Sequence, residues 1–316
     1  MDVERLLARE ERIELRVAPD EQGLRLDRLL ANHLPFASRT RIAAWIRAGR
    51  ARVDGAPVTR AGAQAAAGQS VSLLVEKRPR DTAAGLDDLL ALPVLARGEG
   101  WLAVEKPAGV PSHPAGVAIK RTLLTALALR FAGEFEPGGP WLPHRLDRET
   151  SGLVLVALTR ALAARLADAF ARGEIRRRYD AVVRGDAGER LPRDGSALDL
   201  RFPIARASET PPRFRVDPAG LPAHTRVRLR ERGADASAVE LEPVTGRQHQ
   251  LRVHLAQLGH PIANDPLYDP ERCAGERMQL HARALELPAG VAGNPDPLQL
   301  ETPPPDFPLV SERSRR

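Results

Sequence analysis

In residues 143–158 a polar segment is followed directly by an apolar run, and no other feature of the sequence limits the possible folds as strongly. The polar part reads Pro-His-Arg-Leu-Asp-Arg-Glu-Thr-Ser-Gly, and Leu-Val-Leu-Val-Ala-Leu follows it. An apolar run of this length predicts a buried strand. Asp147 would then lie in a loop that the strand holds in place, which suits a catalytic carboxylate. A helix is expected next, capped by Thr159 and closed by Gly173, with apolar residues at four-residue spacing: Leu162, Leu166 and Phe170.

Asp147 has an ordinary interpretation as well, because an Arg-x-Asp sequence often forms a loop-stabilising ion pair, here with Arg145 or Arg148. Two other segments argue against it. Tyr179 begins a predicted strand behind three arginines, at Arg-Arg-Arg-Tyr-Asp-Ala-Val-Val, although a core tyrosine is the simpler alternative there. Arg252 borders the apolar face of a predicted helix and needs an anionic partner if it is buried. We expect that partner to be Asp147. The apolar face is formed by Leu251, Leu255 and Leu258.

Composition narrows the class of protein. The net charge is +6 and the pI about 10.3, and almost all the basic residues are arginines, which suit phosphate and base-edge contacts. One cysteine, Cys273, excludes an intramolecular disulfide framework and a cysteine-rich zinc site. The charged N-terminus does not resemble a signal peptide, and no apolar run is as long as a membrane span. We expect a cytoplasmic protein that binds no membrane and, lacking a glycine-rich phosphate loop, no nucleotide cofactor.

Changes in composition divide the chain. We expect a leader at 1–16, a compact basic unit at 17–76, a linker at 77–92, a large unit at 93–290 and an irregular tail at 291–316. In the basic unit, Leu24, Leu26, Leu29 and Leu30 predict a first helix that Pro35 ends. Ser38 is expected to cap a second helix that stops at Gly49. A turn at Asp54-Gly55 and a strand at 71–75 follow.

The arginines of the basic unit outnumber its acids, and Arg39, Arg41 and Arg50 lie on or beside the second predicted helix. A solvated arginine face is the simpler explanation. The stretches Leu26-Asp27-Arg28-Leu29-Leu30, Ser38-Arg39 and Gly49-Arg50-Ala51-Arg52-Val53-Asp54-Gly55 nevertheless resemble the small alpha-L RNA-binding domain, first known from a small-subunit ribosomal protein. The resemblance implies that the three arginines bind RNA.

Residues 93–290 resemble the RluA-type pseudouridine synthases. The agreement consists of five ordered segments: Glu-Lys-Pro-Ala-Gly-Val at 105–110, His-Arg-Leu-Asp-x-x-Thr-Ser-Gly at 144–152, Tyr-x-Ala-x-Val at 179–183, Thr-Gly-Arg-x-His-Gln-Leu-Arg-x-His at 245–254, and the segment 259–268. The resemblance implies an α+β fold, with the small alpha-L domain before a catalytic domain built on a mixed, largely antiparallel sheet.

The resemblance also implies roles. Asp147 corresponds to the essential aspartate that attacks the target nucleoside, Tyr179 to the aromatic residue that stacks on the flipped uracil, and Arg252 to the basic partner of the aspartate. Arg145 corresponds to the arginine that enters the RNA where the base has left. Arg176 and Arg177 are expected to meet phosphates. Because the isomerisation is redox-neutral and needs only a nucleophile, we expect no cofactor and no metal.

Several alternatives remain open at this stage. The domain layout favours large-subunit ribosomal RNA as the substrate, but transfer RNA is also possible. A non-catalytic RNA-binding or chaperone factor on the same scaffold is the serious alternative to an enzyme. A kinase loop at 145–147 lacks its accompanying segments. A metal site is disfavoured because helical geometry does not stack histidines at these spacings: His249, His254 and His260.

Overall fold

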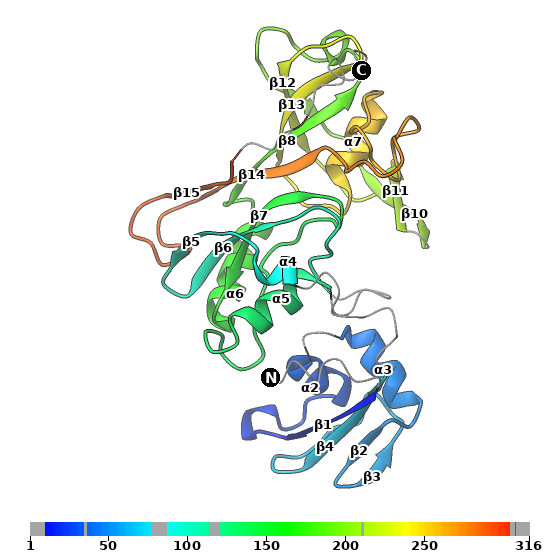
Figure 1. Cartoon of the computed structure of the whole chain (residues 1–316), viewed down its shortest axis with the longest axis vertical. Coiled ribbons are helices and arrows are strands. Elements are labelled where there is room, and N and C mark those ends of the chain that lie inside the picture. Colours follow the sequence, from blue (N-terminus) through cyan, green and yellow to red (C-terminus); the bar gives the residue numbers. More distant parts are fainter. Residues whose placement is uncertain are drawn as a thin grey trace. The chain divides into compact units, whose positions relative to one another are not determined.

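The computed structural model describes residues 10–34, 37–76, 87–113, 121–209, 212–303 and 307, and Figure 1 labels its elements. The chain divides into two compact units. The first comprises residues 1–91, 111–141 and 158–160, and the second comprises residues 92–110, 142–157 and 161–316. The second unit is therefore discontinuous in sequence, whereas the domain predicted at 93–290 is one continuous stretch.

In the described residues, the first unit contains an antiparallel sheet, four α-helices and one short 3-10 helix. Its strand order is β1-β4-β2-β3, and β4 pairs with both β1 and β2. Asp54 and Gly55 both have positive φ, at 46° and 81°, between β2 and β3. That geometry suits a tight hairpin and confirms the predicted turn. The elements are β1 (Glu10–Arg16), η1 (Pro19–Glu21), α2 (Leu26–His33), α3 (Arg39–Arg47), β2 (Ala51–Val53), β3 (Ala56–Val58), β4 (Ser70–Glu76), α4 (Asp87–Leu90) and α5 (Leu123–Arg130).

Helices α2 and α3 form where leucine and isoleucine recur on one face, and these side chains make the core of this unit with β4. The Ser38 hydroxyl accepts a hydrogen bond from the Arg41 N–H at 3.3 Å, so the predicted N-cap is present. The fully buried residues of this core are Leu26, Leu29, Leu30, Ile42, Ile46, Ala51, Val71 and Leu73.

Two predictions for the first unit need correction. Residues 10–16 of the expected leader form β1, which pairs along its whole length with β4, and residues 1–9 lie outside the described part. The linker prediction at 77–92 falls mostly on residues outside the described part, at 77–86, but residues 87–90 form α4 and Leu89 is fully buried. Pro35 also lies outside it, and α2 ends before it, at His33.

The second unit is built on a mixed sheet, which in the described residues has nine strands. Its order is β5-β6-β7-β14-β8-β13-β12-β9, and β15 pairs with β14. The β7–β14 pair is parallel and the other pairs are antiparallel. The predicted α+β class is thus confirmed. The strands are β5 (Val94–Gly98), β6 (Trp101–Lys106), β7 (Ser151–Ala157), β8 (Arg176–Arg184), β9 (Leu198–Leu200), β12 (Thr225–Glu231), β13 (Ala236–Pro243), β14 (Leu280–Leu287) and β15 (Leu298–Glu301).

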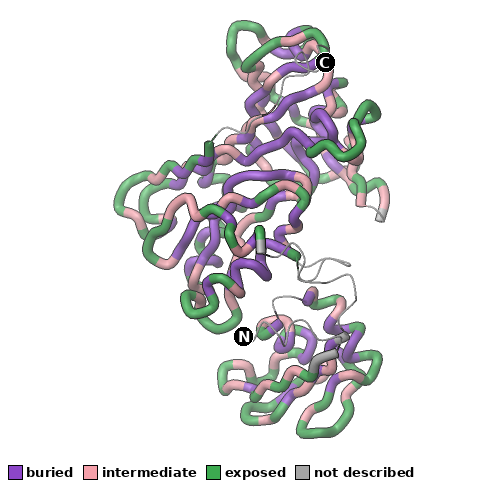
Figure 2. The backbone as a smooth tube through the Cα atoms, in the orientation of Figure 1, coloured by how far each residue is buried: buried purple, intermediate pink, exposed green. Residues whose placement is uncertain are grey.

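Strand β7 confirms the buried strand expected after the polar segment, since all seven of its residues are buried. Figure 2 shows how buried residues follow the strands of this unit. Helix α6 confirms the helix predicted after β7, and α7 confirms the one predicted around Arg252. The remaining elements are α6 (Arg160–Ala171), α7 (Gln250–Leu258), η2 (Ala187–Glu189) and the antiparallel hairpin β10 (Ile204–Glu209) with β11 (Pro212–Val216).

The expected irregular tail at 291–316 is wrong in part, because β15 lies within it and extends the sheet beside β14. A strand of four residues with one buried leucine, Leu300, leaves little periodic signal in the sequence. Residues 304–306 and 308–316 lie outside the described part. Across the described ranges, no helix has both the length and the apolar character needed to cross a membrane.

Candidate active site

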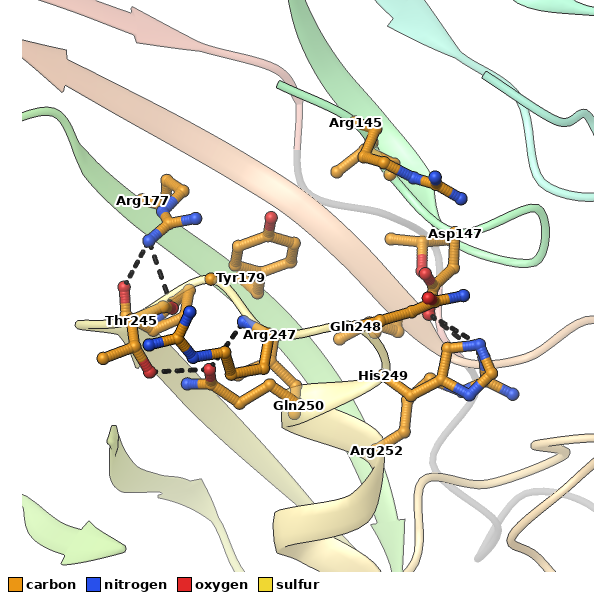
Figure 3. Close-up of a pocket in the computed structure, with 16 residues that line it drawn as sticks. Arg145, Asp147, Arg177, Tyr179, Thr245, Arg247, Gln248, His249, Gln250 and Arg252 are labelled. Atoms are coloured by element: carbon orange, nitrogen blue, oxygen red, sulfur yellow. Dashed lines mark hydrogen bonds and ion pairs between the residues drawn. The ribbon is translucent and has the colours of Figure 1, made fainter. Parts of the chain in front are cut away.

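A cavity of about 210 Å³ in the second unit brings together the three residues predicted to be catalytic. Asp147 reaches it from the loop before β7, Tyr179 from β8 and Arg252 from α7. Figure 3 shows Tyr179 and Asp147 on separate sides of this space, with Arg145 next to Asp147. Arg145 and Arg177 also line the cavity. The cavity therefore combines a carboxylate, an aromatic ring and several cations.

Asp147 is held by Arg252, as the sequence predicted. Arg252 Nη1 donates to Asp147 Oδ2 at 3.0 Å, and the carboxylate side chain remains 19% exposed toward the cavity. Arg148, the neighbour considered as an alternative partner, pairs with Glu149 instead. Asp147 is thus placed as a reactive group would be, because the buried Arg252 holds one carboxylate oxygen while the side chain stays accessible from the cavity.

Asp265 is the second partner of Arg252, a role that was not predicted from the sequence. Arg252 Nε and Nη2 donate to its two carboxylate oxygens, both at 2.7 Å, and neither side chain has appreciable exposure. Burial opposes the charge on Arg252, but the hydrogen bonds and charges of Asp265, and then those of Asp147, outweigh it and raise the pKa of the guanidinium. Arg252 is therefore a fixed cation between two carboxylates.

The loop that carries Asp147 is anchored at both ends. His144 Nε2 accepts the Leu155 N–H of β7 at 2.9 Å, and burial, followed by the charge of Arg177, lowers its pKa to about 3 and keeps the ring neutral. Gly152 has φ 114°, and a Cβ there would stand 2.3 Å from the Ala282 carbonyl oxygen of β14. Only glycine allows that approach at the parallel β7–β14 pair.

Lys106 supports the same loop from β6, and this too was not predicted. Its buried ammonium donates to the carbonyls of Pro107, Val110 and Arg148 at 2.9, 2.8 and 3.2 Å. Burial lowers the pKa of Lys106 to about 7, against the opposing charges of Asp147 and Glu149. The bond to the Arg148 carbonyl reaches the residue next to Asp147, so Lys106 helps to fix the loop.

Tyr179 lies within β8, which begins at Arg176, three residues before the strand start predicted at Tyr179. The residue is 9% exposed, and burial raises the pKa of its phenol, so the hydroxyl stays protonated at neutral pH. Arg177 donates to the carbonyls of Pro243 and Thr245, which closes the cavity wall on this side. A rigid aromatic ring next to fixed cations can hold a planar, polar base.

The other arginines singled out in the sequence do not line this cavity. Arg176 is exposed and faces Glu242 and Glu286, each at 3.8 Å. In the first unit, Arg39 pairs with the buried Asp27 at 3.1 Å and Arg41 stacks on Trp45 at 5.1 Å. Arg50, which directly precedes β2, is half-buried. Their RNA-binding roles stay predictions.

The histidines weighed as metal ligands hydrogen-bond to separate groups. His254 Nε2 lies 2.9 Å from the Phe202 carbonyl oxygen, His260 Nδ1 lies 2.9 Å from that of Arg184, and His249 Nδ1 lies 3.0 Å from the Tyr268 hydroxyl. Within the described part of the chain, no group of three or more His, Cys, Asp or Glu residues is arranged to hold a metal ion.

Comparisons with known proteins agree with this site. Residues 100–257 match the model of the family described as RNA pseudouridylate synthase, and residues 24–71 match the S4 domain. "Ribosomal large subunit pseudouridine synthase D" of Nitrosomonas europaea is 33% identical over 308 residues, covering 94% of this chain and 86% of that protein. "Uncharacterized RNA pseudouridine synthase" of Chloroflexus aurantiacus is 35% identical over 290 residues, covering 89% and 87%.

A solved structure gives the same result. "Human RNA Pseudouridylate Synthase Domain Containing 1" matches with a TM-score of 0.56 and 29% identity, covering 71% of this chain and 86% of that one. The resemblances drawn from the motifs at 144–152, 179–183 and 245–254, and from the basic unit, are confirmed. The chain belongs to the RNA pseudouridine synthase family and carries an S4 domain in its N-terminal part.

Proposed function

We propose that this RNA pseudouridine synthase isomerises uridines of large-subunit ribosomal RNA, with Asp147 as its catalytic carboxylate. The observation that carries the proposal is the Asp147–Arg252 pair facing Tyr179 across one cavity. The substrate class is supported by the relatives named for the large ribosomal subunit and by the S4 domain.

The chemistry requires little beyond these groups. The bond between N1 of uracil and C1′ of ribose breaks, the base turns, and C5 bonds to C1′. The proton on C5 leaves and N1 gains one, so atoms and electrons balance without an oxidant or reductant. A carboxylate can serve as the nucleophile if it is ionised and aimed. Arg252, a buried cation held by Asp265, binds the Asp147 carboxylate and restrains its direction.

The base must leave the RNA stack to reach Asp147. Tyr179 offers a fixed aromatic face for the flipped uracil, and the exposed Arg145 at the cavity wall is placed to enter the vacated position. The buried ring loses little conformational freedom on binding because it is already held within β8. These roles make the cavity a site for one unstacked pyrimidine.

The proposal is tested by pseudouridine mapping on total RNA from cells with and without the gene, with carbodiimide treatment and reverse transcription. Loss of one or a few stops in large-subunit ribosomal RNA is expected. Loss only in transfer RNA would overturn the substrate assignment. Purified protein should release tritium from RNA carrying [5-³H]uridine, because the C5 proton departs on each turnover. Binding without release on both naked and ribosome-bound RNA would contradict catalysis.

RNA affinity should fall steeply with salt, because phosphate contacts release counterions. If about four arginines meet phosphates, the slope of log K against log salt is about −3, and affinity falls about fiftyfold from 50 to 200 mM. Replacing Arg39, Arg41 and Arg50 together by Gln should make the slope shallower by about two. Filter binding across a salt series measures both values.

The matched control is Arg172→Gln, since Arg172 lies among two carboxylates, Asp168 and Glu174, on an exposed surface. It should leave the slope unchanged. A flat salt response of the unaltered protein, or an unchanged slope in the triple variant, would contradict RNA binding by these arginines.

A further inference from the structure

His249 lies in the cavity wall beside Asp147 with an unusual backbone. Its φ is 55° at the N-terminal boundary of α7, a left-handed conformation that few residues other than glycine adopt. The imidazole is 8% exposed, and its Nε2 lies 3.9 Å from Asp147 Oδ2. Figure 3 shows the ring beside Asp147. Strained residues at an active site are held there by their surroundings, and here the surroundings are specific.

Hydrogen bonds around Tyr268 determine where His249 carries its proton. The Phe214 N–H of β11 donates to the Tyr268 oxygen at 2.9 Å. The phenol proton then has His249 Nδ1, at 3.0 Å, as its acceptor among the described residues. His249 Nδ1 is thereby an acceptor, and the ring proton of the neutral imidazole lies on Nε2. The opposite tautomer would place an Nε2 lone pair against the Asp147 carboxylate, which is repulsive.

The charged groups around His249 leave it neutral. Burial lowers the pKa of the imidazole, Asp147 opposes this, and Arg252 adds to it. The charges of Asp265 and Glu149 also oppose the lowering of the pKa, more weakly than that of Asp147. The Phe214 ring packs against the imidazole, with the two ring centres 5.2 Å apart, and completes an apolar side. The ring at neutral pH is therefore a donor at Nε2 and an acceptor at Nδ1.

We propose that His249 is a positioning residue for Asp147, whose Nε2–H closes on Asp147 Oδ2 when RNA fills the cavity, and that Tyr268 fixes the tautomer that makes this possible. The inference rests on the proposed role of Asp147. At 3.9 Å the hydrogen bond is not yet formed, and catalytic hydrogen bonds commonly shorten only in the substrate complex.

The consequence is that one carboxylate oxygen is restrained and the other is directed at the substrate. Arg252 Nη1 already holds Asp147 Oδ2, and His249 Nε2 would supply a second donor to the same atom. Oδ1 then faces the nucleoside. The β10–β11 hairpin contributes to this arrangement as well. The Phe214 N–H of β11 donates to the Tyr268 oxygen, and the Tyr268 hydroxyl in turn bonds to His249.

Two substitutions of His249 separate the donor from the backbone. Asn tolerates positive φ and can accept the Tyr268 hydrogen bond, but it has no group at the Nε2 position. Gln can place an amide N–H there. His249→Asn should lower kcat about ten- to hundredfold with KM for RNA within about threefold, because the carboxylate loses its direction but binding surfaces remain. His249→Gln should recover most of kcat. Steady-state tritium release across a series of RNA concentrations measures kcat and KM.

The tautomer of His249 in the unaltered protein provides a second measurement, and Tyr268→Phe tests its cause. In protein labelled with ¹⁵N at histidine, two-bond couplings should show His249 of the unaltered protein protonated at Nε2 only, near pH 7.5. Tyr268→Phe removes the phenol proton while keeping the ring under Arg252, which lies 5.2 Å from its centre. This variant should show both tautomers and a lower kcat.

Three results would overturn the inference: protonation at Nδ1 in the unaltered protein, an unchanged kcat in His249→Asn, or equal losses in the Asn and Gln variants. Asp147→Asn is assayed alongside. If it retains turnover, the proposed catalytic role of Asp147 fails first. If it is inactive while His249→Asn has full activity, only the positioning role of His249 fails.

Discussion

Asp147→Asn is expected to abolish isomerisation, lowering single-turnover tritium release by at least about a thousandfold, the order seen when a nucleophile is removed. Asn has the same shape and can still accept from Arg252, but it carries no negative charge to attack the nucleoside. RNA affinity should stay within about threefold, because phosphate contacts dominate affinity. The buried Arg252 keeps Asp265 as a counter-ion, so the variant should fold.

Asp168→Asn is the matched control, because it makes the same chemical change at an exposed carboxylate on α6 that pairs with Arg172. Turnover and affinity should both be unchanged. Residual isomerisation by Asp147→Asn near the level of the unaltered protein would show that another group performs the chemistry. Loss of RNA binding in that variant would instead indicate that Asp147 holds the RNA.

The main features of the site could be predicted because they lie in short segments. The polar loop at 143–152 is followed by an unbroken apolar strand, so the placement of Asp147 needed only local patterns. Burying an unpaired charge is costly, so Arg252 beside an apolar helical face predicted an anionic partner. In the structure Arg252 donates to Asp147, the partner that was predicted. The motifs at 144–152, 179–183 and 245–254 also identified the family, which the comparisons confirmed.

The remaining contacts depend on partners far apart in the chain. Asp265 lies 13 residues from Arg252 and Asp147 lies 105 residues from it. The sequence alone does not reveal that the guanidinium binds both carboxylates. Asp265 lies in the segment 259–268, which contributed to the family resemblance but did not indicate a role for this residue. The sequence does not indicate the partners of His249, because its strained φ and its bond to Tyr268 follow from tertiary packing.

Strands β1 and β15 were missed for a related physical reason. Each lies where the sequence has mixed charge and apolar character, and each is stabilised by its partner strand rather than by its own pattern. Ile13 and Leu15 of β1 face Leu73 and Val71 of β4, which is long-range pairing. Such edge strands are poorly specified by local sequence.

Asp265→Asn should destabilise the second unit by about 3 kcal/mol, the order found when one partner of a buried ion pair is removed. Both carboxylate oxygens accept from Arg252, and Oδ1 also accepts the N–H groups of Leu267 and Tyr268 at 2.9 and 3.2 Å. An amide has one acceptor oxygen, so its NH₂ must face either the guanidinium or these backbone donors. Urea unfolding monitored by circular dichroism measures the loss.

Two comparisons isolate the ion pair as the cause. Glu174→Gln removes an exposed partner of Arg172 and should leave the urea midpoint unchanged. In an Arg252→Met background, Asp265→Asn should be far less damaging than in the unaltered protein, because no buried guanidinium is left without its carboxylate. Equal losses in both backgrounds would mean that Asp265 acts through the Leu267 and Tyr268 backbone alone. The 265–268 loop, and with it the Tyr268 hydroxyl on His249, would then be held independently of Arg252.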